Sequence, residues 1–261
     1  MATDSAFVLL VNFLHCSPSI LISFISVLFC NATIVFLKRS YGHAGLCSFL
    51  VIAAVLGNIQ VLYATSYEII NMPVLLGTVT LSSSFFACDM INEFYGATKA
   101  RQAIILSFVM QVFFVISILL TLGHVPLDYH TFQNFSIPED TMNKNTTSIE
   151  QIFLQAPRLL IASFSAYLLS MLGETWLYRL INIKSDLVRN NISLFISSVI
   201  IDTSTFTFIG LVLLSDSPLS CSDFINIFST ACTIRIFCNI VNSVFLKNEK
   251  RTRSKKHPHH H

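Results

Sequence analysis

The chain has 261 residues, of which 53% are hydrophobic and only 11% are charged. Soluble globular domains usually carry about 25% charged residues, so a polar surface cannot enclose a core this apolar, and lipid is the expected solvent. The formal net charge is only +2, and the one dense basic cluster is the segment 247–256. We therefore expect no nucleic-acid-binding surface.

Seven stretches reach the roughly 20 mostly apolar residues that a membrane-spanning helix needs. The sequence thus predicts an all-α protein, a polytopic transmembrane bundle of about seven helices. The first helix is expected within 7–37, with Pro18 near its start. The others are expected over 46–65, 72–94, 103–122, 157–178, 192–214 and 224–246. A polar external loop is expected over 124–155.

The basic residues support this partition, because thirteen of the sixteen Lys and Arg residues fall on one side of a seven-helix zigzag. Basic residues concentrate in cytoplasmic segments of membrane proteins, so we expect the N-terminus outside and the C-terminus in the cytoplasm. The seven cysteines are scattered and form no CxxC pair, so neither a metal site nor a cofactor is expected.

Six ionisable residues fall inside the expected helices. Such residues raise the free energy of membrane insertion by about 2.5 to 3.5 kcal/mol each and mark functional sites by default. They are Asp89, Glu93, Arg158, Glu174, Asp202 and Arg235. Two of them have an alternative interpretation. Glu93 lies near the cytoplasmic end, where it would pair with Lys99 or Arg101, and Arg158 would extend to water at the external mouth.

Polar residues join these charges at helical spacing, so that each forms a stripe on one helix face. The stripes comprise Asp89, Asn92 and Glu93; Ser163, Tyr167, Ser170 and Glu174; Ser198, Asp202 and Thr205; and Arg235, Asn239 and Asn242, with Asn58 and Gln60 on the helix before them. Lipid cannot solvate such stripes, so we expect them to face one another across a central cavity. A single Asn or Ser is alternatively a hydrogen-bonding contact between helices.

The chemistry of these stripes fits a small polar solute. A carboxylate accepts two hydrogen bonds from a guanine-type edge, which presents a ring N–H and an exocyclic amine. Arg and Asn side chains donate to a carbonyl oxygen on the same ligand. A planar heterocycle matches this set of residues, as do other polar solutes.

The segment 86–101, FACDMINEFYGATKAR, resembles a stretch at the cytoplasmic end of a helix in the queuosine precursor transporters, formerly called putative vitamin uptake transporters. The resemblance continues through 158–167 and 202–206, and it includes Asn58 and Arg235. It covers roughly 46–246. On this basis we expect an extra N-terminal helix and first cytoplasmic loop at 1–45, a six-helix transporter core at 46–246, and a basic cytoplasmic tail at 247–261.

The resemblance implies a non-enzymatic importer in the bacterial inner membrane. Its expected partners are the lipid bilayer and a 7-deazaguanine, namely 7-cyano-7-deazaguanine, 7-aminomethyl-7-deazaguanine or queuine, salvaged for tRNA modification. The implied substrate-binding residues are Asn58, Asp89, Glu93, Arg158, Tyr167, Glu174, Asp202 and Arg235. Whether the chain forms an oligomer or needs an ATPase partner stays open.

The chain departs from the family pattern at two positions where the family has Gln, because Met171 and Val199 stand there; Glu174 also replaces an Asp. A substrate with a larger apolar group, such as queuine, is one hypothesis that follows. Three other functions remain as alternatives: a vitamin-type transporter or a substrate-binding component of an energy-coupling-factor system, an intramembrane enzyme with Asp89 and Asp202 as an aspartyl pair, and a scaffold without a ligand.

Overall fold

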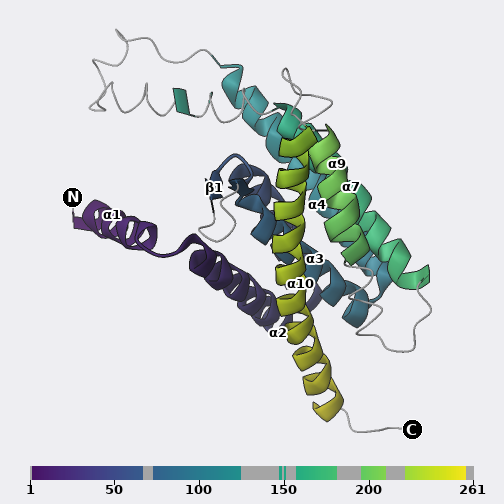
Figure 1. Cartoon of the computed structure of the whole chain (residues 1–261). Helices are drawn as coiled ribbons and strands as arrows, with labels where there is room; N and C mark the ends of the chain where they lie inside the picture. Colours follow the sequence, from purple (N-terminus) through teal and green to yellow (C-terminus); the bar gives the residue numbers. More distant parts are fainter. Residues whose placement is uncertain are drawn as a thin grey trace.

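The computed structural model describes residues 2–66, 73–124, 147–148, 150, 157–180, 195–209 and 221–256. Most of the loop expected over 124–155 and both ends of the helix expected over 192–214 therefore lie outside the described residues. The described chain is almost entirely helical, and its long helices pack side by side in a bundle (Figure 1). This confirms the expected helical class.

The first expected helix is divided in two. Helix α1, Ala2–His15, ends before Pro18, and helix α2, Ser19–Gln60, begins directly after it. Proline ends one helix and suits the start of the next, because it lacks an N–H donor and fixes φ. Helix α1 lies beside the bundle (Figure 1). Its 14 residues extend about 21 Å, which is too short to cross the roughly 30 Å hydrocarbon core.

Helix α2 has 42 residues and contains a sharp bend at Gly42, where φ is 61° and ψ is −133°. A Cβ added to Gly45 would lie 2.6 Å from the carbonyl oxygen of Leu37. A straight helix would separate residues eight positions apart by about 12 Å. The chain therefore doubles back, and α2 consists of two segments, 19–41 and 43–60, that correspond to the first two expected spans.

A short β-hairpin replaces the expected ends of two helices. Strand β1, Ala64–Ser66, pairs antiparallel with strand β2, Pro73–Leu75, so that Thr65 faces Val74. The predictions that one helix extends to residue 65 and the next begins at residue 72 are therefore wrong. Pro73 has no N–H donor and disfavours a helix interior, and the next helix starts four residues later, at Gly77.

Helix α3, Gly77–Tyr95, is the centre of the bundle. Each of its residues from 77 to 92 is buried, and it packs against α2, α4, α7 and α10. A Cβ on Gly77 would approach the carbonyl oxygen of Gly57 to 2.4 Å, so small residues allow the two backbones to lie close together. Because α3 contacts protein on all sides, its many Ser and Thr residues need no contact with lipid.

Three further long helices surround α3. Helix α4 is Ala97–Leu122, helix α7 is Pro157–Leu180 and helix α10 is Cys221–Lys256. Gly96, with φ of 89°, separates α3 from α4. The expected helix over 157–178 is confirmed, whereas α4 begins six residues earlier than expected and α10 continues through the basic segment expected to be a tail.

The described part of the expected sixth helix is irregular. Residues Phe195–Asp202 form a π-helical segment, η1, which is followed by the short helix α9, Thr203–Thr207. π-Helical turns are rare and are frequently found at functional sites. This one ends at Asp202, one of the ionisable residues expected to bind substrate.

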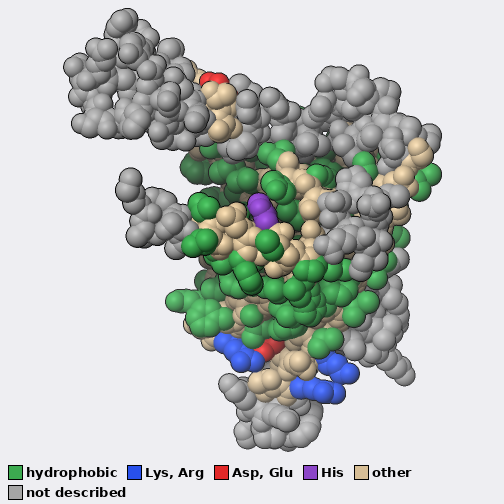
Figure 2. Space-filling model, turned by 60° about the vertical axis from the view of Figure 1, so that its left-hand side comes forward, with side chains coloured by type: hydrophobic (Ala, Val, Ile, Leu, Met, Phe, Trp, Pro, Cys, Tyr) green, Lys and Arg blue, Asp and Glu red, His purple; other side chains and the backbone are tan. Residues whose placement is uncertain are grey.

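Apolar side chains cover much of the surface. Among the described residues, three helices are long and apolar enough to cross a membrane: α2, α4 and the Phe224–Thr252 part of α10. Phe29, Phe113 and Ile240 on these helices are more than 60% exposed. Figure 2 shows hydrophobic side chains over the middle of one face, with Lys and Arg side chains grouped at one end. The count of seven spans stays a prediction.

The basic end is held together by ion pairs between helices. On α10, Glu249 accepts a hydrogen bond from Lys38 at 3.0 Å and pairs with Arg39 of α2, and Lys250 pairs with Glu93 of α3 at 2.8 Å. Lys38 also lies over the ring of Phe94, 3.2 Å from its centroid. These contacts place the ends of α2, α3 and α10 together.

The bend at Gly42 provides a test of this arrangement. We expect Gly42→Ala to lower the stability of the detergent-solubilised protein by about 1 to 3 kcal/mol, because an L-residue is strained at this φ and ψ. Gly173→Ala is the matched control, since its added Cβ would make an ordinary 3.4 Å contact with Ile201. Thermal melts followed by tryptophan fluorescence measure both, and equal melting temperatures for the two variants would contradict the bend.

Candidate functional site

The polar face of α7 organises the interior of the bundle. Ser163, Tyr167, Ser170 and Glu174 lie on this face at helical spacing, and all four are buried. Each of them contacts a different group of residues on the surrounding helices. The stripe expected from the sequence is therefore present and faces protein.

At the first position, Ser163 donates a hydrogen bond to the Oδ1 atom of Asn58 on α2. The Nδ2 atom of Asn58 in turn donates to the Oε1 atom of Gln111 on α4 at 2.8 Å, and to the carbonyl oxygen of Ala54 at 2.9 Å. Asn58 therefore connects three helices through a buried amide network. Such networks fix the relative position of helices when their polar atoms have partners.

At the second position, the hydroxyl of Tyr167 lies 2.6 Å from the hydroxyl of Ser107 on α4. Tyr167 is only 2% exposed. Buried Tyr hydroxyls usually find such a partner. The contact holds in place the aromatic ring of Tyr167, which lines a cavity around Asp202 and Arg235.

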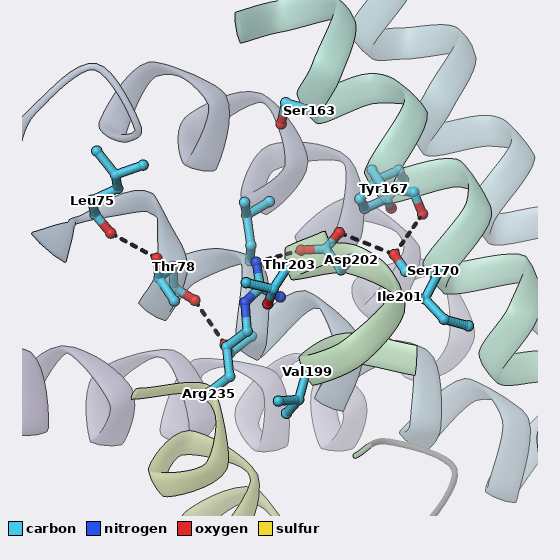
Figure 3. Close-up of polar contacts among 12 residues, drawn as sticks. Leu75, Thr78, Ser163, Tyr167, Ser170, Val199, Ile201, Asp202, Thr203 and Arg235 are labelled. Carbon is cyan, nitrogen blue, oxygen red and sulfur yellow. Dashed lines mark hydrogen bonds and ion pairs between the residues drawn. The ribbon is translucent and has the colours of Figure 1, made fainter. Parts of the chain in front are cut away.

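At the third position, Ser170 donates a hydrogen bond of 3.1 Å to the Oδ1 atom of Asp202 (Figure 3). The Oδ2 atom of Asp202 pairs with the Nη2 atom of Arg235 on α10. Asp202 and Arg235 are each 5% exposed, so this is a buried ion pair. Both carboxylate oxygens of Asp202 thus have a partner within the protein.

At the fourth position, Glu174 lies within hydrogen-bonding reach of Asp89 on α3. Both carboxyl groups are 2% exposed. The structure therefore pairs Asp89 with Glu174 and pairs Asp202 with Arg235. This arrangement does not support the alternative in which Asp89 and Asp202 form an aspartyl pair.

The ion pair lies in a cavity between the β-hairpin and helices α3, α7, α9 and α10. The described residues that line it are Val61, Val74, Leu75, Thr78, Leu81, Phe85, Ser163, Ala166, Tyr167, Asp202, Thr203, Phe206, Thr207, Ile227, Ala231 and Arg235. The cavity volume is about 40 Å³, which holds a few water molecules at most. A ligand the size of a nucleobase requires the walls to move apart.

The eight residues expected to bind substrate are therefore not all in one place. Tyr167, Asp202 and Arg235 line the cavity, whereas Asn58 reaches it through Ser163. Asp89 and Glu174 form a separate pair. Glu93 pairs with Lys250, a partner that was not considered from the sequence. The side chain of Arg158 lies outside the described residues.

The sequence did not lead us to expect several polar and aromatic residues of the interior. Gln111 and Ser107 complete the networks of Asn58 and Tyr167, and Thr78 and Phe206 line the cavity. Ser107 and Gln111 are spaced by four residues within an apolar helix, and this spacing was a detectable sign of a buried polar face. Phe206 ends the segment 202–206 that resembles the family, but it was not named as a substrate-binding residue, because 23 Phe residues are distributed along the chain.

Over the described residues, no group of three or more His, Cys, Asp or Glu side chains is arranged to hold a metal ion. The described lining of the cavity offers one carboxylate, one guanidinium, several hydroxyls and three aromatic rings, those of Phe85, Tyr167 and Phe206. Such a set binds a polar planar molecule by hydrogen bonds and stacking.

Comparison with known proteins identifies related sequences. The family model described as "Putative vitamin uptake transporter" matches residues 75–247. A curated protein of Bacillus subtilis (strain 168), named "Probable queuosine precursor transporter", is 31% identical over 140 residues, covering 54% of this chain and 55% of the relative. The chain thus spans about half the length of this relative. No solved structure matches. The family resemblance drawn from the sequence motifs is confirmed.

The ion pair can be tested by a double-mutant cycle. Removing one partner of a buried pair leaves an uncompensated charge and destabilises proteins by about 3 to 5 kcal/mol. We expect Asp202→Asn and Arg235→Gln each to lower the melting temperature of the purified protein. The double variant is expected to lower it by less than the sum of the two single decreases. The exposed Arg251 provides a matched control, Arg251→Gln, which is expected to melt like the parent. Additive losses would contradict a direct ion pair.

Proposed function

The chain belongs to the putative vitamin uptake transporter family, and we propose that it imports a 7-deazaguanine precursor of queuosine across the bacterial inner membrane. Family membership and the apolar helices make it a multi-pass membrane transporter. The substrate, the direction of transport and the residues that bind the substrate are our proposal. The observation that carries it is a buried acid–base pair inside a cavity of the bundle.

Asp202 and Arg235 suit the two polar edges of a deazaguanine. The ring N–H and exocyclic amine of the base donate two hydrogen bonds, and a carboxylate such as that of Asp202 accepts both. The guanidinium of Arg235 donates to the carbonyl oxygen of the same base. The name of the Bacillus subtilis relative supports this assignment over other planar solutes with similar edges.

The remaining walls suit the flat faces of the base. Tyr167 and Phe206 contribute aromatic rings to the cavity, and aromatic rings stack on planar heterocycles. In our proposal Asn58 acts indirectly by positioning Ser163, with which it is hydrogen-bonded. Asp89 and Glu174 lie next to the substrate path, and Arg158 acts at its external mouth.

The proposed direction of transport rests on the two ends of the bundle. The cavity is lined by Val61, Val74 and Leu75 of the β-hairpin region. The opposite end carries the ion pairs of Glu93 and Glu249 and the grouped basic side chains. Because basic residues concentrate on the cytoplasmic side, we place the hairpin and the N-terminus outside and the C-terminus inside. The segment 46–246 then forms the transport core, with 1–45 as an addition and 247–261 as a basic extension.

A vitamin-type solute is the second candidate, because the family description refers to vitamin uptake. A substrate-binding component of an energy-coupling-factor system would additionally need an ATPase. ATP depletion would then abolish uptake while chemical uncouplers would leave it intact in the short term.

We expect the chain to restore queuosine when it is expressed in a bacterium that makes no queuosine and lacks its own precursor transporter. Each precursor is supplied at low external concentration, and queuosine in tRNA is measured by boronate gel shift. The host carries a tRNA-guanine transglycosylase that accepts the precursor tested. Asp202→Ala and Arg235→Ala are expected to abolish the signal while the protein remains in the membrane. Absence of queuosine with every precursor, despite membrane insertion of the parent chain, would refute the proposed substrate class.

A further inference from the structure

The charged groups that line the described part of the cavity are one acid, Asp202, and one base, Arg235, and their charges cancel. We propose that this balance makes the cavity selective for electrically neutral ligands. Among the precursors named above, it favours 7-cyano-7-deazaguanine, whose nitrile is uncharged, over 7-aminomethyl-7-deazaguanine, whose amine is a cation at neutral pH. The inference rests on the proposed function and specifies the substrate class of the same cavity.

Ligand entry must first separate the two charged side chains. The Oδ2 atom of Asp202 is occupied by Arg235, and its Oδ1 atom is occupied by Ser170. The cavity of about 40 Å³ leaves no room for a base beside them. A deazaguanine therefore takes the place of the Arg235 guanidinium at the carboxylate of Asp202.

The displaced guanidinium then needs a new acceptor, because an unpaired buried charge is strongly unfavourable. The ligand supplies this acceptor as its carbonyl oxygen. In the loaded state the neutral base lies between Asp202 and Arg235, donating to the first and accepting from the second. The two protein charges still compensate each other, so loading leaves the total charge of the site at zero.

A cationic ligand changes this balance, since it adds a third charge to a site that already has equal numbers of positive and negative charges. The other described walls are apolar or carry uncharged hydroxyls, such as Thr78, Thr203 and Thr207. The described acids Glu174 and Asp89 do not line the cavity, and they lie within hydrogen-bonding reach of each other. Glu174 lies one helical turn after Ser170 on α7. It is therefore farther than Tyr167 and Ser170 from the end of α7 that we place outside. The amine of the cationic precursor therefore meets no compensating carboxylate in the cavity.

The test measures initial uptake of radiolabelled 7-cyano-7-deazaguanine at pH 7 in cells that lack other precursor transporters. Unlabelled 7-cyano- and 7-aminomethyl-7-deazaguanine are added as competitors. An alkylamine keeps its proton at this pH, since its pKa is about 10. We expect half-maximal inhibition by the neutral competitor at a concentration at least about tenfold lower, the ratio that corresponds to 1.4 kcal/mol.

Two variants shift the charge of the cavity in opposite directions. Arg235→Gln leaves the carboxylate of Asp202 uncompensated. We expect inhibition by the cationic precursor to strengthen about tenfold relative to inhibition by the neutral one. Asp202→Asn leaves Arg235 uncompensated, and we expect the ratio to move further toward the neutral one. Arg251→Gln removes the same charge from an exposed position on α10 and is expected to leave the ratio unchanged. Because each ratio is measured within one variant, it does not depend on the amount of folded protein.

The outcomes separate the inference from the proposed function. Labelled uptake by the parent chain with equal or stronger inhibition by the cationic precursor overturns the inference and leaves the proposed function standing. The inference is also overturned if Arg235→Gln and Asp202→Asn shift the ratio in the same direction. If a variant is not inserted, or is inserted but shows no saturable uptake, the ratio of the parent chain decides. Absence of saturable uptake by the inserted parent chain overturns the proposed function and, with it, the inference.

Discussion

The fold depends on one constraint, namely that polar and charged side chains within a membrane protein need partners inside the protein. Helix α7 meets it with four buried polar residues: Ser163, Tyr167 and Ser170 are each hydrogen-bonded to a different neighbour, and Glu174 lies close to Asp89. Helix α3 meets it by being enclosed on every side over 77–92. The apolar faces of α2, α4 and α10 are then free to contact lipid. The arrangement of helices around the cavity follows from this division between protein-facing and lipid-facing surfaces.

The same constraint connects the structure to transport. Arg235 pairs with Asp202, and the cavity around them has a volume of only about 40 Å³. A substrate that offers both donors and an acceptor can separate the two residues without leaving either charge unpaired, whereas water alone enters only as a few molecules. Ion pairs at the basic end join α2, α3 and α10 through Glu93 and Glu249. In the proposed orientation this end is cytoplasmic, so opening there has to exchange or break these contacts, about 21 Å along α10 from Arg235.

Much of the fold follows from local sequence patterns, but the partners within the cavity do not. Apolar length and the distribution of Lys and Arg predict where long helices lie, and the helix expected over 157–178 is confirmed as α7. The β-hairpin was not predicted, because three-residue strands leave little signal beside long apolar runs. The reversal at Gly42 falls in the connection that the sequence predicted between the first two helices, although its single positive φ was not predicted. The spacing of Ser163, Tyr167, Ser170 and Glu174 identifies one polar face. Which of Asp89, Glu174, Asp202 and Arg235 pair with one another depends on helix rotation and on the π-helical segment at 195–202, and spacing within a single helix does not contain this information.

Equilibrium binding of 7-cyano-7-deazaguanine to the purified full chain tests the central claim most directly, because it removes transport energetics and host metabolism from the result. Isothermal titration calorimetry is performed on the parent protein and on Asp202→Asn, with Arg251→Gln as the exposed-charge control. The account predicts saturable binding by the parent and the control, and binding that is at least about tenfold weaker in Asp202→Asn, because a bidentate carboxylate contact is lost. Unchanged affinity in a folded Asp202→Asn protein would contradict the assignment of this cavity as the substrate site.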